Sequence, residues 1–173
     1  IAKEAAHNGY RTLLVSREMS AEQYGLRAFS SITGIDTATL YRARSLTDDQ
    51  WVRAGDAAAE FGQLPIEFTF RASTVEDVRR EARAMKGIEL LIVDYIQILQ
   101  TASTYPSDNS RVAHISRMLK EIALDLQIPV LALSQFSRPP KGVTKRPQVS
   151  DLRDSGSIEQ DADCIWLMWQ PQH

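Results

Sequence analysis

Short apolar runs alternate with helical patterns along this chain. Runs rich in Val, Ile and Leu occupy 12–16, 89–94 and 129–134. Runs of this length, separated by helices, are typical of buried strands in a parallel sheet. A weaker alternation at 65–70 and an apolar stretch at 163–169 indicate two further strands. We therefore predict an α/β fold with a mostly parallel sheet covered by helices on both faces.

Capping signals and apolar spacing predict the helices. Ser20 and Thr47 each precede a glutamine by three positions, which is the spacing of a capping box. The pair Asn8-Gly9 is suited to end a helix, and apolar side chains recur every three or four residues after Ser107. The expected helices cover 1–8, 21–32, 47–61, 74–86 and 107–127.

Composition narrows the class of protein. With 173 residues, 43% of them apolar, we expect one domain, 1–173, with its own core. A net charge of -2 neither supports nor excludes nucleic-acid binding. We expect a fragment of a longer protein, because the chain opens on Ile1 without an initiator Met.

The single cysteine, Cys164, lies in an apolar run, where we expect it to pack as a small hydrophobe. One cysteine gives no disulfide framework, which favours a reducing, cytoplasmic compartment. No apolar stretch approaches the ~20 residues that span a bilayer, so we expect no membrane segment. The histidines are scattered, which argues against a structural zinc site.

A polar residue suited to nucleotide hydrolysis follows each of the strongest strand patterns. Glu18, Asp94 and Gln135 would share one edge, because ligands of open α/β sheets bind at the carboxyl ends of the strands. A glutamate there can activate water, an aspartate can hold the hydration shell of Mg²⁺, and an amide can contact a phosphate. Each also has a plain structural alternative: an exposed acid before a helix, a turn residue and a polar strand end.

The long connection 137–157 concentrates positive charge. It carries Arg138, Lys141, Lys145, Arg146 and Arg153 against Asp151 and Asp154, so five positive charges less two negative charges give +3. A loop of this length usually binds a partner or is disordered, and a nucleic-acid backbone would suit it. Ser157 has capping-box spacing to Gln160, which predicts a short helix there. The alternative is a solvated loop with incidental charge.

Taken together, these segments resemble the RecA-like motor domain of DnaB-family replicative DNA helicases. The segment 16–23 is similar to the one that carries the catalytic glutamate, 91–98 to the Walker B strand, and 131–138 to the segment of the phosphate-sensing glutamine. The most specific part, 145–163, resembles the DNA-binding loop and the strand after it.

This resemblance implies a homohexameric ring that moves 5′ to 3′ on single-stranded DNA, driven by ATP with Mg²⁺, in a bacterial or bacteriophage protein. By position, Glu18 would activate water, Asp94 would hold the magnesium shell and Gln135 would sense the γ-phosphate. The resemblance also suggests a primase and a helicase loader as further partners.

The same resemblance implies a DNA-backbone contact at Arg153, Asp154 and Gly156. Asp154 stands where the family usually has Glu, which shortens its reach, and Arg17 replaces a usually aliphatic residue.

Two parts of the family pattern are not found between Ile1 and His173. The glycine-rich Walker A loop should precede Ile1, and the arginine finger should follow His173. The fold we expect is therefore a P-loop NTPase core without its Walker A strand and loop, and we expect the isolated fragment to be inactive. The competing functions are another RecA-type ATPase, recombinase-like or clock-like, and a ring component that binds DNA without turnover.

Overall fold

The computed structural model describes residues 1–136, 146–152 and 155–170. Its sheet has four parallel strands in the order β2-β1-β3-β4. The strands are β1 (Thr12–Ser16), β2 (Ile66–Thr69), β3 (Leu90–Asp94) and β4 (Val130–Ala132). All four lie where the apolar runs predicted them, which confirms the parallel α/β fold.

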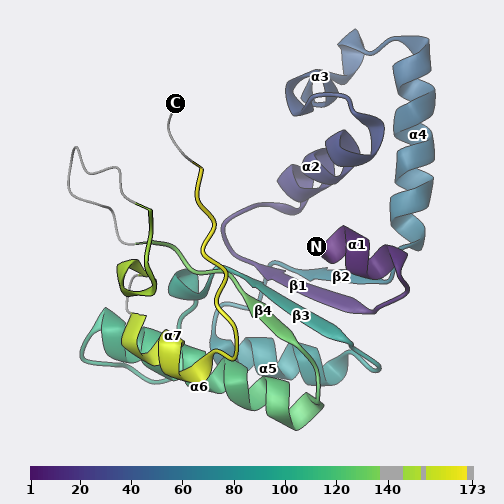
Figure 1. Ribbon diagram of the computed structural model, residues 1–173. Helices are drawn as coiled ribbons and strands as arrows, with labels where there is room; N and C mark the ends of the chain where they lie inside the picture. The colour runs from purple at the N-terminus through teal and green to yellow at the C-terminus, as the bar shows by residue number, and fades with distance from the viewer. Residues whose placement is uncertain (137–145, 153–154, 171–173) are drawn as a thin grey trace.

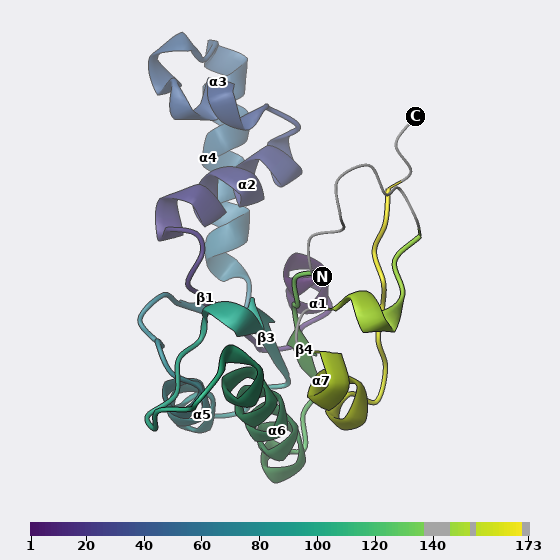
Figure 2. The same ribbon diagram turned by 90° about the vertical axis from the view of Figure 1, so that its left-hand side faces the viewer.

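Helices lie on both sides of this sheet (Figure 1). The α-helices are α1 (Ala2–His7), α2 (Ala21–Thr33), α3 (Thr37–Tyr41), α4 (Asp48–Gln63), α5 (Val75–Ala84), α6 (Asp108–Leu126) and α7 (Ser155–Asp161). Short 3-10 turns cover Ala43–Ser45, Ile96–Ile98 and Val149–Asp151. Helices α5, α6 and α7 lie on one side and α1 on the other, while α2, α3 and α4 project beyond the sheet (Figures 1 and 2).

The main core lies between the sheet and the pair α5 and α6. Alternate strand residues such as Val15, Leu91 and Val93 point to this face, since successive side chains of a strand point to opposite faces. Ile115 and Ile122 of α6 are fully buried in the same cluster. The apolar stripe of α6 therefore forms core, as its periodicity predicted.

The capping boxes predicted at Ser20 and Thr47 are both formed. Each hydroxyl accepts from the backbone N–H three residues later, at 3.3 Å, and the glutamine side chain there accepts from the backbone N–H of the cap. Helix α3 was missed: Asp36 caps it, in a stretch where the sequence predicts only the end of the preceding helix.

The strand predicted over 163–169 is wrong. This segment follows α7 without regular secondary structure, because it pairs with no strand in the described parts of the chain. Trp166 and Met168 are 72% and 86% exposed. The packing predicted for Cys164 is wrong for the same reason, since its side chain is exposed.

The short helix predicted after Ser157 is confirmed, but its predicted cap is wrong. Helix α7 begins at Ser155, so Ser157 lies inside its first turn. Among the described residues, no helix is both long and apolar enough to cross a membrane.

Candidate functional site

The polar residues predicted to act together lie at one edge of the sheet. Strand β3 pairs in parallel with both β1 and β4, and Ser16 lies opposite Asp94. Glu18 follows the end of β1, Asp94 ends β3, and Gln135 follows the end of β4. Since all three positions are at the carboxyl ends of adjacent parallel strands, the fold brings them to the same edge, as expected.

Asp94 is held by contacts from the β1–α2 segment. Its carboxylate oxygen Oδ2 accepts a hydrogen bond from the hydroxyl of Tyr24, in the first turn of α2. Its backbone carbonyl accepts from the backbone N–H of Arg17, at 3.4 Å. The aspartate is half-buried, and no other hydrogen bond to its carboxylate is found within the described residues.

The environment of Tyr24 keeps its hydroxyl protonated. Burial, and after it the hydrogen bond to the Asp94 carboxylate, raise the pKa of Tyr24 to about 12. The nearby Ser16 hydroxyl acts in the opposite direction. The Ser16 oxygen is itself buried and has no hydrogen-bond partner of acceptable geometry in the described structure.

Glu18 lies in the turn between β1 and α2, where its side chain is exposed. No hydrogen bond or ion pair of its carboxylate is found among the described residues. Its neighbour Arg17 is committed elsewhere: the guanidinium donates to the backbone carbonyl of Phe70, at 3.0 Å. The glutamate is thus free to approach a ligand at this edge, and Arg17 anchors its turn to the end of β2.

Gln135 is connected to the end of β3 by a residue that the sequence did not single out. The side-chain amide of Gln97 donates to the Ser134 hydroxyl at 2.8 Å and accepts from the backbone N–H of Gln135 at 3.3 Å. Arg111 of α6 in turn donates to the backbone carbonyls of Gln97 and Leu99. This network ties the ends of β3 and β4 together.

The donors at this edge fit a hydrated magnesium ion. Mg²⁺ keeps several water ligands in proteins and is commonly held through one or two carboxylates plus substrate phosphates. Asp94 offers its oxygen Oδ1 for this purpose, and the described residues contain no cluster of three or more His, Cys, Asp or Glu side chains that would form a protein cage.

The predicted DNA-binding residues are only partly described. Arg153 and Asp154 lie outside the described residues, as does most of the basic part of 137–157. Gly156 is exposed in the first turn of α7, and a Cβ atom there would meet no atom within 4 Å. An isolated antiparallel bridge joins Phe136 to Leu152, so the residues that flank 137–151 meet directly after Gln135.

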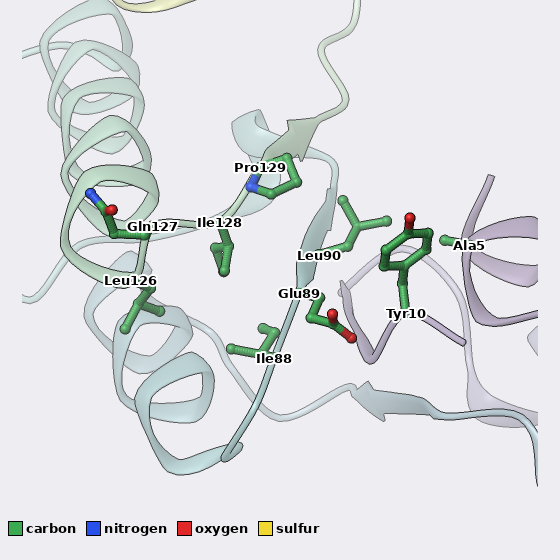
Figure 3. A pocket seen from close by; sticks show the side chains of 9 residues that line it. All are labelled: Ala5, Tyr10, Ile88, Glu89, Leu90, Leu126, Gln127, Ile128 and Pro129. Atoms are coloured by element: carbon green, nitrogen blue, oxygen red, sulfur yellow. The ribbon is translucent and has the colours of Figure 1, made fainter. Parts of the chain in front are cut away.

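A pocket of about 500 Å³ lies at the opposite edge of the sheet (Figure 3). Tyr10, Leu90 and Pro129 line it at the amino ends of β1, β3 and β4, together with residues of α1 and the end of α6. It therefore shares no residue with the edge that carries Glu18, Asp94 and Gln135.

The fold of this chain is similar to that of solved structures. The chain superimposes with a TM-score of 0.87 on a solved ATPase domain, at 32% identity over 94% of this chain and 60% of that one. The TM-score is 0.86 for a DnaB-like replicative helicase studied with its interactions with primase, at 31% identity over 94% of this chain and 41% of that one. The fold is therefore RecA-like.

The relatives found by sequence similarity are named replicative DNA helicases. The replicative DNA helicase DnaB of Haemophilus influenzae is 36% identical over 92% of this chain, and that of Mycobacterium leprae is 34% identical over 92%. The chain spans 36% and 27% of those two proteins, so it matches only a part of each. The family model described as the DnaB-like helicase C terminal domain matches residues 1–173. The chain belongs to the DnaB-like helicase C-terminal domain family.

Proposed function

We propose that this chain is the ATP-driven motor of a replicative DNA helicase, which moves on single-stranded DNA and unwinds duplex DNA. The observation that carries the proposal is the convergence of Glu18, Asp94 and Gln135 on one edge of the sheet. Family membership adds the context of replication, because the relatives carry that function in their names.

Each residue has a distinct role in the proposed hydrolysis of ATP. The exposed Glu18 carboxylate accepts a proton from the attacking water as general base. Asp94 orients the hydration shell of Mg²⁺, which when bound neutralises developing phosphate charge. Gln135 contacts the terminal phosphate through its neutral amide and changes position when that phosphate leaves.

The basic connection carries the proposed link from hydrolysis to DNA. Its base is the Phe136–Leu152 bridge, directly after Gln135 and directly before Arg153. A shift of Gln135 would therefore reach both Phe136, at the start of the connection, and Leu152, next to Arg153. We propose that Arg153, Asp154 and Gly156 contact the DNA backbone, without base recognition, since the sequence of 137–157 contains no aromatic residue and Phe136 just precedes it.

Family membership also supports a proposal for assembly and compartment. A homohexamer on single-stranded DNA in the bacterial cytoplasm is the proposed working form, and a primase is the partner that the relative studied with primase suggests. Binding of a helicase loader remains a prediction. The same holds for the organisation of residues 1–173 as a single domain.

The decisive experiment is the substitution Glu18→Gln in the full-length protein that contains residues 1–173, called the parent protein below. We expect ATP hydrolysis to fall by about 10²- to 10⁴-fold, because the general base is removed. ATP affinity should be unchanged, since the phosphate contacts remain. Steady-state hydrolysis and binding of a fluorescent nucleotide measure the two effects.

Glu22→Gln is the matched control, because Glu22 is also exposed and lies only four residues away, in the first turn of α2. It should leave hydrolysis within twofold of the unsubstituted protein. Equal loss of hydrolysis and nucleotide affinity in Glu18→Gln would instead indicate a structural role. Hydrolysis without unwinding by the parent protein would favour a RecA-type ATPase of another class.

A further inference from the structure

We propose that Tyr24 is a positioning residue for the magnesium site, whose hydroxyl holds one oxygen of Asp94 and leaves the other directed to the hydration shell of the ion. This inference rests on the proposed function, which assigns the metal to Asp94. It adds a residue from a different element, α2, that no motif on β3 contains.

The hydrogen bond defines which oxygen of Asp94 is available. Tyr24 donates to Oδ2, while Oδ1 makes no hydrogen bond within the described residues. A carboxylate with two unbonded oxygens rotates among several orientations, and fixing it costs side-chain entropy. Because Tyr24 fixes the orientation before the ion arrives, that cost is already met in the folded protein.

The ring of Tyr24 is placed by aromatic packing. Its centroid lies 5.8 Å from that of Phe68 in β2 and 5.9 Å from that of Phe70 just after β2. Such aromatic pairs add stability beyond the area they bury. The hydroxyl is therefore held at the edge of the sheet by contacts that do not depend on Asp94.

The same residue also fixes the turn that carries Glu18. Tyr24 lies four residues after Ser20, the cap of α2, so its bond to Asp94 connects the start of this helix to the end of β3. The Arg17 backbone N–H makes a second connection, to the Asp94 carbonyl. Glu18 stands between these two attachments, which set its position relative to Asp94.

The test is Tyr24→Phe in the parent protein, which removes one oxygen and keeps the ring. We expect the affinity for Mn²⁺ in the presence of a non-hydrolysable ATP analogue, measured by electron paramagnetic resonance, to fall by about 3- to 10-fold. The Mg²⁺ concentration that gives half-maximal ATP hydrolysis should rise by the same factor. Nucleotide affinity in EDTA should not change, because the metal is absent.

Tyr10→Phe is the matched control, since Tyr10 is 52% exposed and lines the pocket at the opposite edge. It should leave the Mn²⁺ affinity unchanged. Tyr24→Leu removes the ring as well as the hydroxyl, so an equal shift in both Tyr24 variants assigns the effect to the hydroxyl. Melting temperatures show whether each variant is folded.

The outcomes separate this inference from the proposed function. If the parent protein binds the Mn²⁺–nucleotide pair and Tyr24→Phe binds it within twofold as well, the inference is overturned and the proposed function stands. If the parent protein does not bind the pair at all, the proposed function fails and the inference fails with it. A similar loss of nucleotide affinity in EDTA would show that Tyr24 only maintains the fold.

Discussion

At the residue scale, the polar side chains at the end of the sheet differ in how firmly the fold holds them. Asp94 is half-buried and bonded to Tyr24, whereas Glu18 and Gln135 are exposed. A metal-holding group benefits from a fixed orientation, while a base and a phosphate sensor must approach a ligand. The fold therefore orients the Asp94 carboxylate and leaves the side chains of Glu18 and Gln135 exposed, as the proposed roles require.

Arg153 provides a prediction at this scale. In the parent protein, Arg153→Ala should weaken binding to single-stranded DNA and reduce the dependence of log K on log salt by about 0.7, since one phosphate contact is lost. Fluorescence anisotropy over a series of salt concentrations measures the slope. The control Arg44→Ala removes an exposed arginine from the α2–α4 projection and should leave the slope unchanged. An unchanged slope for Arg153→Ala would exclude a phosphate contact.

At the scale of elements, specific hydrogen bonds hold the segments that connect strands to helices. Helix α5 begins with a capping box in which Thr74 accepts from the backbone N–H of Asp77. The Asp77 carboxylate accepts from the backbone N–H groups of Thr74 and Ser73, both at 3.1 Å, and contacts Arg80 at 2.6 Å. The helix start is thus held mainly by bonds to an ionised carboxylate.

This cap predicts a dependence of stability on pH. The hydrogen bond from the Thr74 backbone N–H, together with Arg80, holds the pKa of Asp77 well below its usual range. An aspartate whose pKa is lowered by folding stabilises the protein fully at pH values above about 4, its pKa in the unfolded chain. This stabilisation is lost as the pH falls toward the pKa of the same carboxyl in the folded protein. Asp77→Asn should therefore lower the free energy of unfolding by about 1 kcal/mol at pH 7.

Urea unfolding at pH 7 and at pH 3 measures this effect. The difference between Asp77→Asn and the unsubstituted protein should shrink at the lower pH, because there the Asp77 carboxylate of the unfolded chain takes up protons while that of the folded protein stays ionised. Asp49→Asn is the control, because Asp49 is 79% exposed and its ion pair with Arg53 lies on the surface of α4. A difference that stays constant with pH would contradict the electrostatic origin of the effect.

Gln97 provides the second prediction for elements, because its side chain bridges β3 and β4. Gln97→Ala removes the bonds to Ser134 and to the Gln135 backbone, so the segment that carries the proposed phosphate sensor loses these two attachments. We expect kcat for ATP hydrolysis to fall by about 5- to 10-fold and KM to change by less than twofold.

Gln97→Glu should retain more of kcat than Gln97→Ala, since a carboxylate can still accept from the Gln135 N–H and from the Ser134 hydroxyl. The matched control is Gln100→Ala, whose side chain is exposed in the same connection. A normal kcat in Gln97→Ala would show that the bridge is not needed for turnover.

At the scale of the whole molecule, the described residues form one face of the proposed nucleotide site. The sheet carries the residues to which we assign water activation, metal binding and phosphate sensing, but residues 1–173 contain no Gly-x-x-x-x-Gly-Lys segment to bind the phosphates. The polypeptide of residues 1–173 alone should therefore bind ATP much more weakly than the parent protein and hydrolyse almost none. A calorimetric titration that gives micromolar affinity for this polypeptide would contradict the prediction.

What the sequence determined by itself was local. The aliphatic runs at β1, β3 and β4 and the stripe of α6 predict the parallel fold, because burial imposes a simple periodicity on each element. The polar residues after the strands were predictable for the same reason, since parallel strands place their carboxyl ends together. The family resemblance supplied the roles proposed for these residues.

Only the tertiary structure decided which distant side chains meet. Tyr24 and Asp94 are 70 residues apart, and Gln97 and Ser134 are 37 residues apart, so no local pattern connects them. The apolar run after α7 shows the converse: its composition favours a strand, but a strand also needs a hydrogen-bonded neighbour, and the described sheet gives it none. Strand pairing and contacts between distant side chains depend on the three-dimensional arrangement, whereas the periodic spacing of buried residues can be recognised in the sequence.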